Sequence, residues 1–174
     1  MGKALFPAIY IVRCACSASL SYWLALMIGL PFPVWASMSG VIVSQAKLNE
    51  TRASLLWRIV GTLVGIVVSL IVDAAIGSFV GTGWQILISV GICAAIATRY
   101  PLLRVSMWTA PIVLLTAGPS VAVHSAGLYR GAEVILGCLV GGAFHLLAER
   151  LIWAIGLPAG AHPASPLQRG MDDD

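Results

Sequence analysis

Charged side chains are scarce in this chain of 174 residues. Asp, Glu, Lys and Arg together make up 10% of it, against about 25% in soluble domains. Hydrophobic residues make up 59%. A chain of this composition has too little polar surface to cover itself in water, so a soluble globular domain is excluded. The expected class is a bundle that is embedded in a lipid bilayer and contacts the lipid directly.

The alternation of polar and apolar residues that marks the strands of a membrane barrel is also missing. The apolar runs are rich in Leu, Ile, Val and Ala and contain no regular in–out pattern. The sequence therefore predicts an all-α integral membrane protein.

Motifs of enzymes are absent as well. There is no Walker A loop, no G-x-S-x-G and no H-E-x-x-H, and Gly81-Thr82-Gly83 lacks the rest of a dinucleotide fingerprint. The four cysteines fall inside apolar runs, and Cys14-x-Cys16 has no partners at metal-ligand spacing. We expect no enzymatic activity, no catalytic residues, no cofactor and no metal site.

The net charge of +3 does not indicate binding to nucleic acid, because the basic residues stand at the ends of apolar runs. Lysine and arginine in such positions mark cytoplasmic loops. Those that favour one side are Lys3, Lys47, Arg52, Arg99, Arg104, Arg150 and Arg169. With an even number of spans, this distribution predicts a multi-pass protein of the inner (plasma) membrane with both termini in the cytoplasm. Arg130 is the exception, since it would lie on the outer side.

The apolar runs predict six transmembrane helices within residues 1–157. The spans are expected near residues 11–30, 34–48, 55–80, 84–98, 105–123 and 128–155. The first run carries Arg13 near its start and no small-residue cleavage site, so we expect a retained span rather than a signal peptide. Residues 158–174, rich in Pro, Gly and Ala, are expected to form a flexible cytoplasmic tail.

The connection between the first two spans is short and carries no charge. Pro31 and Pro33 end the first helix. Such a turn could lie below the membrane surface if other parts of the protein cover it. The second span has a short apolar part, so it is either tilted, with Gln45 and Lys47 at the interface, or partly re-entrant. We favour the tilted arrangement.

A weak internal repeat is visible around two arginines. Gly61 and Gly65 follow Arg58 at +3 and +7, whereas Arg130 is followed by glutamate at +3 and by glycine at +7 and +11. The arginines stand 72 residues and three spans apart, so their helices run in opposite directions. This pattern indicates an inverted 3+3 repeat.

Four glycines in these helices favour close helix packing. They are Gly61, Gly65, Gly137 and Gly141. Their four-residue spacing is typical of faces on which two membrane helices touch. The contact can be within one chain or between two chains.

At these residues the chain resembles the fusaric-acid-resistance (FUSC-type) and aromatic acid exporter family, over about residues 10–150. The motifs are Pro31-x-Pro33-x-Trp35, Arg58-x-x-Gly61-Thr62-x-x-Gly65 and Arg130-x-x-Glu133-x-x-x-Gly137. The resemblance implies inner-membrane efflux of aromatic carboxylic acids driven by the proton gradient. Plant malate channels look like distant members, which implies an anion channel as the alternative. Larger members carry a second membrane half or a cytoplasmic domain, so a non-transporting accessory or scaffold subunit is a third interpretation.

Two arginines and two tryptophans are candidates for binding an organic anion. Arg58 and Arg130 could pair with a carboxylate, since a planar guanidinium binds it bidentately. The alternatives are that Arg58 fixes the topology and that Arg130 forms a structural ion pair with Glu133, three residues along the helix. Trp35 and Trp108 could stack on an aromatic substrate or serve in packing.

Two acidic residues are candidates for proton coupling, because ionisable groups at membrane depth are rare unless they have a function. Glu133 is one and Asp73 is the other. Asp73 lies fifteen residues after Arg58, which is about 22 Å along a helix. A cluster of Asp73, Glu133 and Arg130 in the outer half of the membrane is therefore sterically possible.

The size of the chain predicts assembly. Transporter sites usually lie between two related halves, and one six-span unit supplies at most one half by comparison with its larger relatives. Closed two-fold pairing is the commonest form of assembly. We therefore expect a parallel homodimer.

Overall fold

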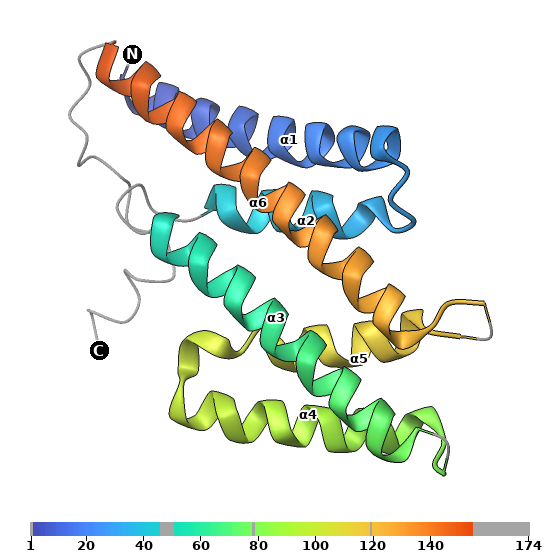
Figure 1. Cartoon of the computed structure of the whole chain (residues 1–174). Helices are drawn as coiled ribbons and strands as arrows, with labels where there is room; N and C mark the ends of the chain where they lie inside the picture. The colour runs from blue at the N-terminus through green and yellow to red at the C-terminus, as the bar shows by residue number, and fades with distance from the viewer. Residues whose placement is uncertain (1, 46–50, 78, 119, 155–174) are drawn as a thin grey trace.

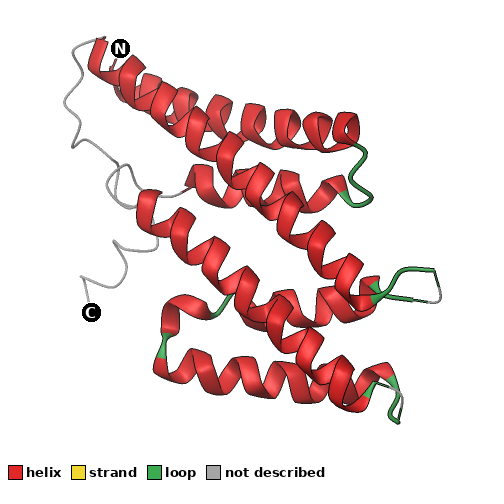
Figure 2. Cartoon of the chain, viewed as in Figure 1, coloured by secondary structure: helices red, strands yellow, loops and turns green. Residues whose placement is uncertain are grey.

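Six α-helices and one short 3-10 turn make up the described part of the chain (Figures 1 and 2). The structure is a computed structural model that describes residues 2–45, 51–77, 79–118 and 120–154. The helices are α1 (Gly2–Ile28), α2 (Pro33–Gln45), α3 (Thr51–Ile76), α4 (Thr82–Arg99), α5 (Ser106–Thr116) and α6 (Val123–Ala154), with η1 (Pro101–Leu103) between α4 and α5. The prediction of an all-α fold with six helices is confirmed.

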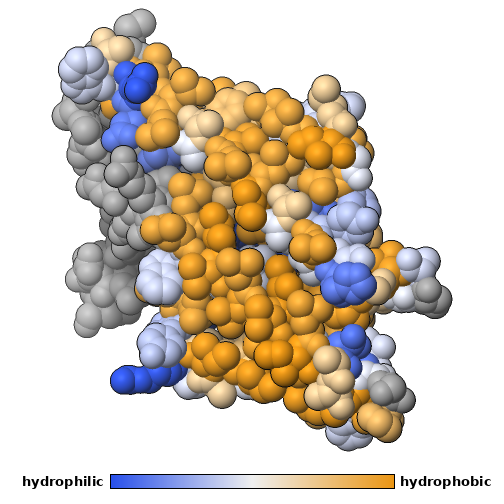
Figure 3. Space-filling view, viewed as in Figure 1, coloured by the Kyte–Doolittle hydropathy of each residue, from blue (hydrophilic) through white to orange (hydrophobic). Residues whose placement is uncertain are grey.

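Four of these helices are long and apolar enough to cross a membrane. The candidate spans are Ala8–Ile28, Leu55–Ile76, Thr82–Arg99 and Val123–Ala154, and Pro33–Ser44 and Pro101–Thr116 are shorter apolar segments. Large hydrophobic side chains point outward, as Met27 and Trp153 show with more than four-fifths of their surface exposed. Figure 3 shows hydrophobic residues across the middle of one face and hydrophilic ones toward its left and right margins. The chain is thus a multi-pass membrane protein.

The helix bounds differ from the predicted spans at several ends. The first helix begins at Gly2 and the last at Val123, both earlier than predicted. The apolar residues before Ile11 belong to α1, and α6 also includes His124 and Ser125, which precede its apolar run. The helix predicted to reach residue 123 ends at Thr116, since Gly118 precedes a proline and such residues avoid the helical region. The helix predicted to reach residue 80 ends at Ile76. The predicted tail, residues 158–174, lies outside the described residues.

The turn between α1 and α2 is built around Gly29. Its φ of +80° is in the left-handed region, which glycine adopts without steric cost. The N–H of Gly29 donates to the carbonyl of Leu26 at 3.0 Å, and the N–H of Leu30 donates to that of Ala25 at 2.9 Å. These are the two bonds of a Schellman motif, which satisfy carbonyls at the end of α1. Pro33 then opens α2, where its missing N–H costs nothing.

The long helices α3 and α6 cross the bundle and tie its two sides together (Figure 1). One side is formed by α1 and α2, which both pack against α6, and the other by α4 and α5, which both pack against α3. The helices α3 and α6 also contact each other. The contacts of the two sides correspond to each other if α1 is matched with α4, α2 with α5 and α3 with α6. The pairs α1–α2, α1–α6, α2–α6 and α2–α3 then correspond to α4–α5, α3–α4, α3–α5 and α5–α6, and α3–α6 corresponds to itself.

Several polar side chains and glycines are buried on the α1–α2–α6 side of the bundle. Arg13, Ser17 and Ser21 follow one another at four-residue spacing along α1, and all three are buried. On α6 the buried positions Gly137 and Gly141 continue the same close packing. Large apolar side chains therefore cover much of the outer surface, whereas the buried positions hold both polar and apolar side chains.

Candidate functional site

Arg130 lies in the second turn of α6, buried against the start of α2. Its guanidinium carbon is 4.3 Å from the centre of the Trp35 ring, and only 5% of the residue is exposed. A guanidinium over an aromatic face is attracted by the negative charge density of the ring. Two residues 95 positions apart in the chain are thus in direct contact.

Glu133 follows Arg130 by almost one helical turn and is fully buried. Its Oε1 accepts a hydrogen bond of 2.9 Å from the backbone N–H of Phe32, at the entrance of α2. This N–H has no partner within the helix, and a carboxylate at a helix N-terminus is also favoured by the helix dipole. The charge-free turn between α1 and α2 is therefore joined to α6 at Phe32, whereas Gly29 and Pro31 remain exposed.

Arg58 reaches the same region from α3. Its Nη2 donates to the hydroxyl of Ser39 on α2 at 3.3 Å. Arg58 and Arg130 are close enough to act on each other electrostatically. Three helices thus bring two positive charges and one carboxylate together inside the bundle.

Several polar atoms of this group have no hydrogen-bond partner within the described structure. They are Arg58 Nε, Arg130 Nε, Arg130 Nη1 and Glu133 Oε2, all buried. Among the described residues no ion pair joins Arg130 and Glu133, although their spacing allows one: Glu133 Oε1 accepts from Phe32 and Oε2 is left without a partner. Buried donors without an acceptor are costly. Such donors around a net positive charge are suited to hold an anion with oxygen acceptors.

The structure brings four of the predicted residues together and leaves two apart. Trp35, Arg58, Arg130 and Glu133 form the group described above. Trp108 lies on the outer surface of α5, 72% exposed. Asp73 lies near the end of α3, where its carbonyl accepts the N–H of Gly77 at 2.7 Å.

The sequence interpretation missed two members of the group. One is the backbone N–H of Phe32, which binds Glu133, and the other is Ser39, which binds Arg58. A signal for Ser39 was present, since it follows Trp35 by four residues and therefore shares its helix face.

Glycines set the close approach that lets these side chains meet. A Cβ added at Gly137 would collide with the carbonyl oxygen of Ala36, and one at Gly141 would lie 2.7 Å from that of Gly40. Only glycine permits this distance between α6 and α2. Gly61 and Gly65 allow a similar approach of α3 to the start of α5. A Cβ added at Gly61 would lie 3.1 Å from the Cβ of Val105, and one added at Gly65 would lie 2.7 Å from the Cβ of Thr109.

Comparison with known proteins identifies a family. The model of the fusaric acid resistance protein-like family matches residues 20–144. That range contains Trp35, Arg58, Arg130 and Glu133. No curated protein and no solved structure matches the chain. Among the described residues, no group of His, Cys, Asp and Glu could hold a metal ion. With most of its length matched and four helices able to span a bilayer, this membrane protein belongs to the fusaric acid resistance protein-like family.

Proposed function

We propose that this protein exports organic anions, above all aromatic carboxylic acids, across the inner membrane. The observation that supports it most is the set of buried guanidinium nitrogens without partners on Arg58 and Arg130. Two cations and one carboxylate leave the group with a net charge of +1, which a bound monovalent anion would neutralise. A family with a transporter-related membrane function is consistent with this proposal.

The geometry suggests how an aromatic acid would bind. Its carboxylate would accept a hydrogen bond from one of the two unpartnered Arg130 nitrogens, Nε or Nη1, and Arg58 would add a second cation. Trp35 holds the plane of the Arg130 guanidinium by a cation–π contact. Planar guanidinium groups also stack on aromatic rings, so an aromatic substrate gains contacts at this site that an aliphatic acid lacks.

Glu133 is the group that we propose to couple anion binding to protons. In its ionised form the carboxylate competes with the substrate for the two guanidinium charges. Protonation of Glu133 removes this competition, so a proton and an anion favour each other's binding. Coupling of this sign moves the anion and the proton in the same direction, so export by this route has to be driven by the anion's own gradient. Export driven by the proton gradient, which the family resemblance implies, requires exchange of the anion for a proton at a separate group, and Asp73 is the candidate for that group.

Transport into liposomes tests the proposal. Purified protein should carry aromatic carboxylates with saturable rates, whereas the matching aromatic amides, which lack the charge, should cross at the background rate. Arg130→Gln should lower kcat/KM by about tenfold or more, the size of a lost charge-assisted hydrogen bond. Arg104→Gln, an exposed arginine in the connection to α5, is the matched control. Equal transport of acids and amides, or normal transport by Arg130→Gln, would contradict the anion site.

An anion channel is the second candidate, because positively charged side chains inside the membrane can also line an anion pore. Planar-bilayer recording separates the two functions. Discrete current steps in an anion gradient would assign the channel, and saturable flux without such steps would assign the transporter. Protein that inserts but shows neither activity would be an accessory or scaffold subunit.

We further propose that the fold is an inverted 3+3 repeat, with all six helices spanning the membrane. The exchange symmetry of the helix contacts supports it. Equivalent packing contacts in the two halves also support it. Gly65 lies against Thr109, and Gly137 lies against Ser39. Gly137 follows Gly65 by 72 residues, and Thr109 follows Ser39 by 70, so the two contacts occupy corresponding positions. In the same register, Ser69 donates to the carbonyl of Ala110, and Gly141 lies against that of Gly40.

Six spans and the loop charges together place both termini in the cytoplasm in this proposal. Cysteine labelling at Arg99 and at Ser120, one at a time in a cysteine-free variant, tests it in intact cells. A cysteine at Ser120 should react with an impermeant reagent from outside, and one at Arg99 should not. The reverse result would indicate the opposite orientation in the membrane. Equal reaction of the two cysteines from outside would contradict the proposed topology.

We also propose that the protein works as a parallel homodimer. The four packing glycines lie against helices of the same chain, so the dimer contact would use other surfaces. Native mass spectrometry in mild detergent with retained lipid tests this. A chain that still transports when reconstituted at less than one copy per vesicle would disprove the need for a dimer.

A further inference from the structure

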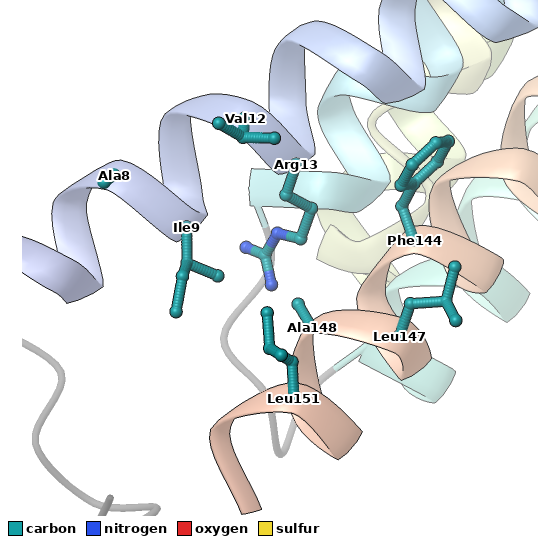
Figure 4. Close-up of a pocket in the computed structure, with 8 residues that line it drawn as sticks. All are labelled: Ala8, Ile9, Val12, Arg13, Phe144, Leu147, Ala148 and Leu151. Carbon is teal, nitrogen blue, oxygen red and sulfur yellow. The ribbon is translucent and has the colours of Figure 1, made fainter. Parts of the chain in front are cut away.

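A groove opens on the surface between the start of α1 and the end of α6 (Figure 4). Its volume is about 370 Å³. The lining residues are Ala8, Ile9, Val12, Arg13, Phe144, Leu147, Ala148 and Leu151. Seven of these eight are apolar, and Arg13 alone is charged. The groove lies far from the Arg130 group, since Arg130 and Ala148 are eighteen residues and about 27 Å apart along α6.

Arg13 is held in place by two partners on other helices. Its Nη1 donates to Nδ1 of His145 at 3.2 Å, and its Nη2 donates to the backbone carbonyl of Ser44. A guanidinium has donors only, so His145 Nδ1 must be the acceptor. The Arg13 guanidinium also lies over the Tyr10 ring, 5.6 Å from its centre.

These partners leave the charge of Arg13 uncompensated. The residue is 94% buried, and no carboxylate among the described residues pairs with it. Its Nε is buried and has no hydrogen-bond partner. A buried cation of this kind favours an anion from outside the chain, and the groove is the space that its side chain lines.

We propose that this groove binds an anionic phospholipid, with the phosphate on Arg13 and one acyl chain along the apolar walls. The rim supports a lipid, because Val12, Leu147 and Leu151 are each about half exposed or more and would face the bilayer. An acyl chain can therefore reach the groove without leaving the membrane. A soluble anion would have to cross apolar surface to reach the same arginine.

The direction of the Arg13 side chain fits a headgroup phosphate. Figure 4 shows its guanidinium directed toward Ile9 and Leu151. A headgroup phosphate would reach it from this side, where α1 begins and α6 ends. Long cationic side chains bend toward the headgroups in this manner.

Lipid retention tests the proposal on the full-length protein in detergent micelles. The probes are phosphatidylglycerol and phosphatidylcholine with identical acyl chains, followed by native mass spectrometry. We expect the wild type to retain phosphatidylglycerol preferentially. Arg13→Gln should weaken that retention by about tenfold, as expected for a lost charge-assisted contact. Arg104→Gln, an exposed arginine outside the groove, should leave it unchanged.

A second variant keeps the charge and fills the groove. Ala8 is exposed on the rim, so Ala8→Leu should fold normally and should still lose the retained lipid. If Arg13→Gln does not fold, the Ala8→Leu variant alone tests whether lipid occupies the groove. Equal retention of both lipids by the wild type, or unchanged retention in Ala8→Leu, would overturn the proposal. Inorganic phosphate that displaces the lipid at micromolar concentration would assign the site to free phosphate and would also overturn it.

Discussion

The backbone N–H of Phe32 donates to the carboxylate of Glu133 at 2.9 Å, which joins two residues 101 positions apart. The contact closes the turn between α1 and α2 onto α6, and the same turn of α6 lays Arg130 on Trp35. One carboxylate therefore has two roles here, since it caps α2 and balances part of the positive charge of the proposed anion site.

Substitution of Glu133 should separate these two roles. Glu133→Gln keeps an oxygen acceptor for Phe32 and removes the charge, so the protein should fold and the pH dependence of anion binding should disappear. In the wild type, affinity should rise as the pH falls, because protonation of Glu133 removes a competing negative charge. Binding measured by tryptophan fluorescence over a range of pH checks this. A pH dependence that is unchanged in Glu133→Gln would rule out Glu133 as the coupling group.

Glu133→Ala should instead lower stability. It leaves the Phe32 N–H without its partner in a buried place, at a cost of about 1–3 kcal/mol. Thermal unfolding in detergent should show a lower midpoint than Glu133→Gln under the same conditions. Equal midpoints for the two variants would mean that the hydrogen bond contributes nothing to stability.

Replacement of the tryptophan under Arg130 should weaken anion binding in a graded way. Trp35→Phe retains an aromatic face and should cost little, whereas Trp35→Leu removes a contact of about 0.5–2 kcal/mol. The dissociation constant for an aromatic acid should rise by a few-fold to about thirtyfold in Trp35→Leu. Trp108→Leu is the matched control, because Trp108 is on the outer surface. A larger effect at Trp108 than at Trp35 would move the site to α5.

Alanine at Gly137 should destabilise the bundle. The added methyl group would collide with the carbonyl of Ala36 and push α6 from α2, at about 1–3 kcal/mol for overpacking. Gly91→Ala on α4 is the control, because its added methyl group would meet nothing within 4 Å. That change should be neutral or stabilising by up to about 1 kcal/mol. Unfolding midpoints of both variants against the wild type provide the measurement, and equal losses would show that the collision at Gly137 is relieved.

Alanine at Gly29 should introduce backbone strain at the turn. Its φ of +80° costs a residue with a Cβ roughly 1–2 kcal/mol. Gly29→Asn should be milder, since asparagine visits this region more readily. Limited proteolysis and thermal unfolding should rank the wild type above Asn and Asn above Ala. An alanine variant as stable as the wild type would contradict the strained turn.

Local properties of the sequence determined the class of the protein and its helices. Composition alone excludes a soluble globular domain. The apolar runs, interrupted by prolines, glycines and charged residues, predict six helices. The helix ends are harder to predict, because a helix can include polar residues outside its apolar run, as α6 does with His124 and Ser125. The family could also be recognised, since its motifs are short segments that contain Trp35, Arg58 and Arg130.

Only the tertiary structure decided which candidates meet. When a helix is apolar on every face, its sequence does not show which face points into the bundle. Trp35 and Trp108 are therefore equal candidates for the binding site by sequence. Their difference arises where glycines let one helix touch another: α6 approaches α2 at Gly137 and Gly141, which places Arg130 on Trp35. The burial of Glu133 and its bond to Phe32 depend on the same long-range contact. Such pairings join residues about a hundred positions apart, and no local pattern encodes them.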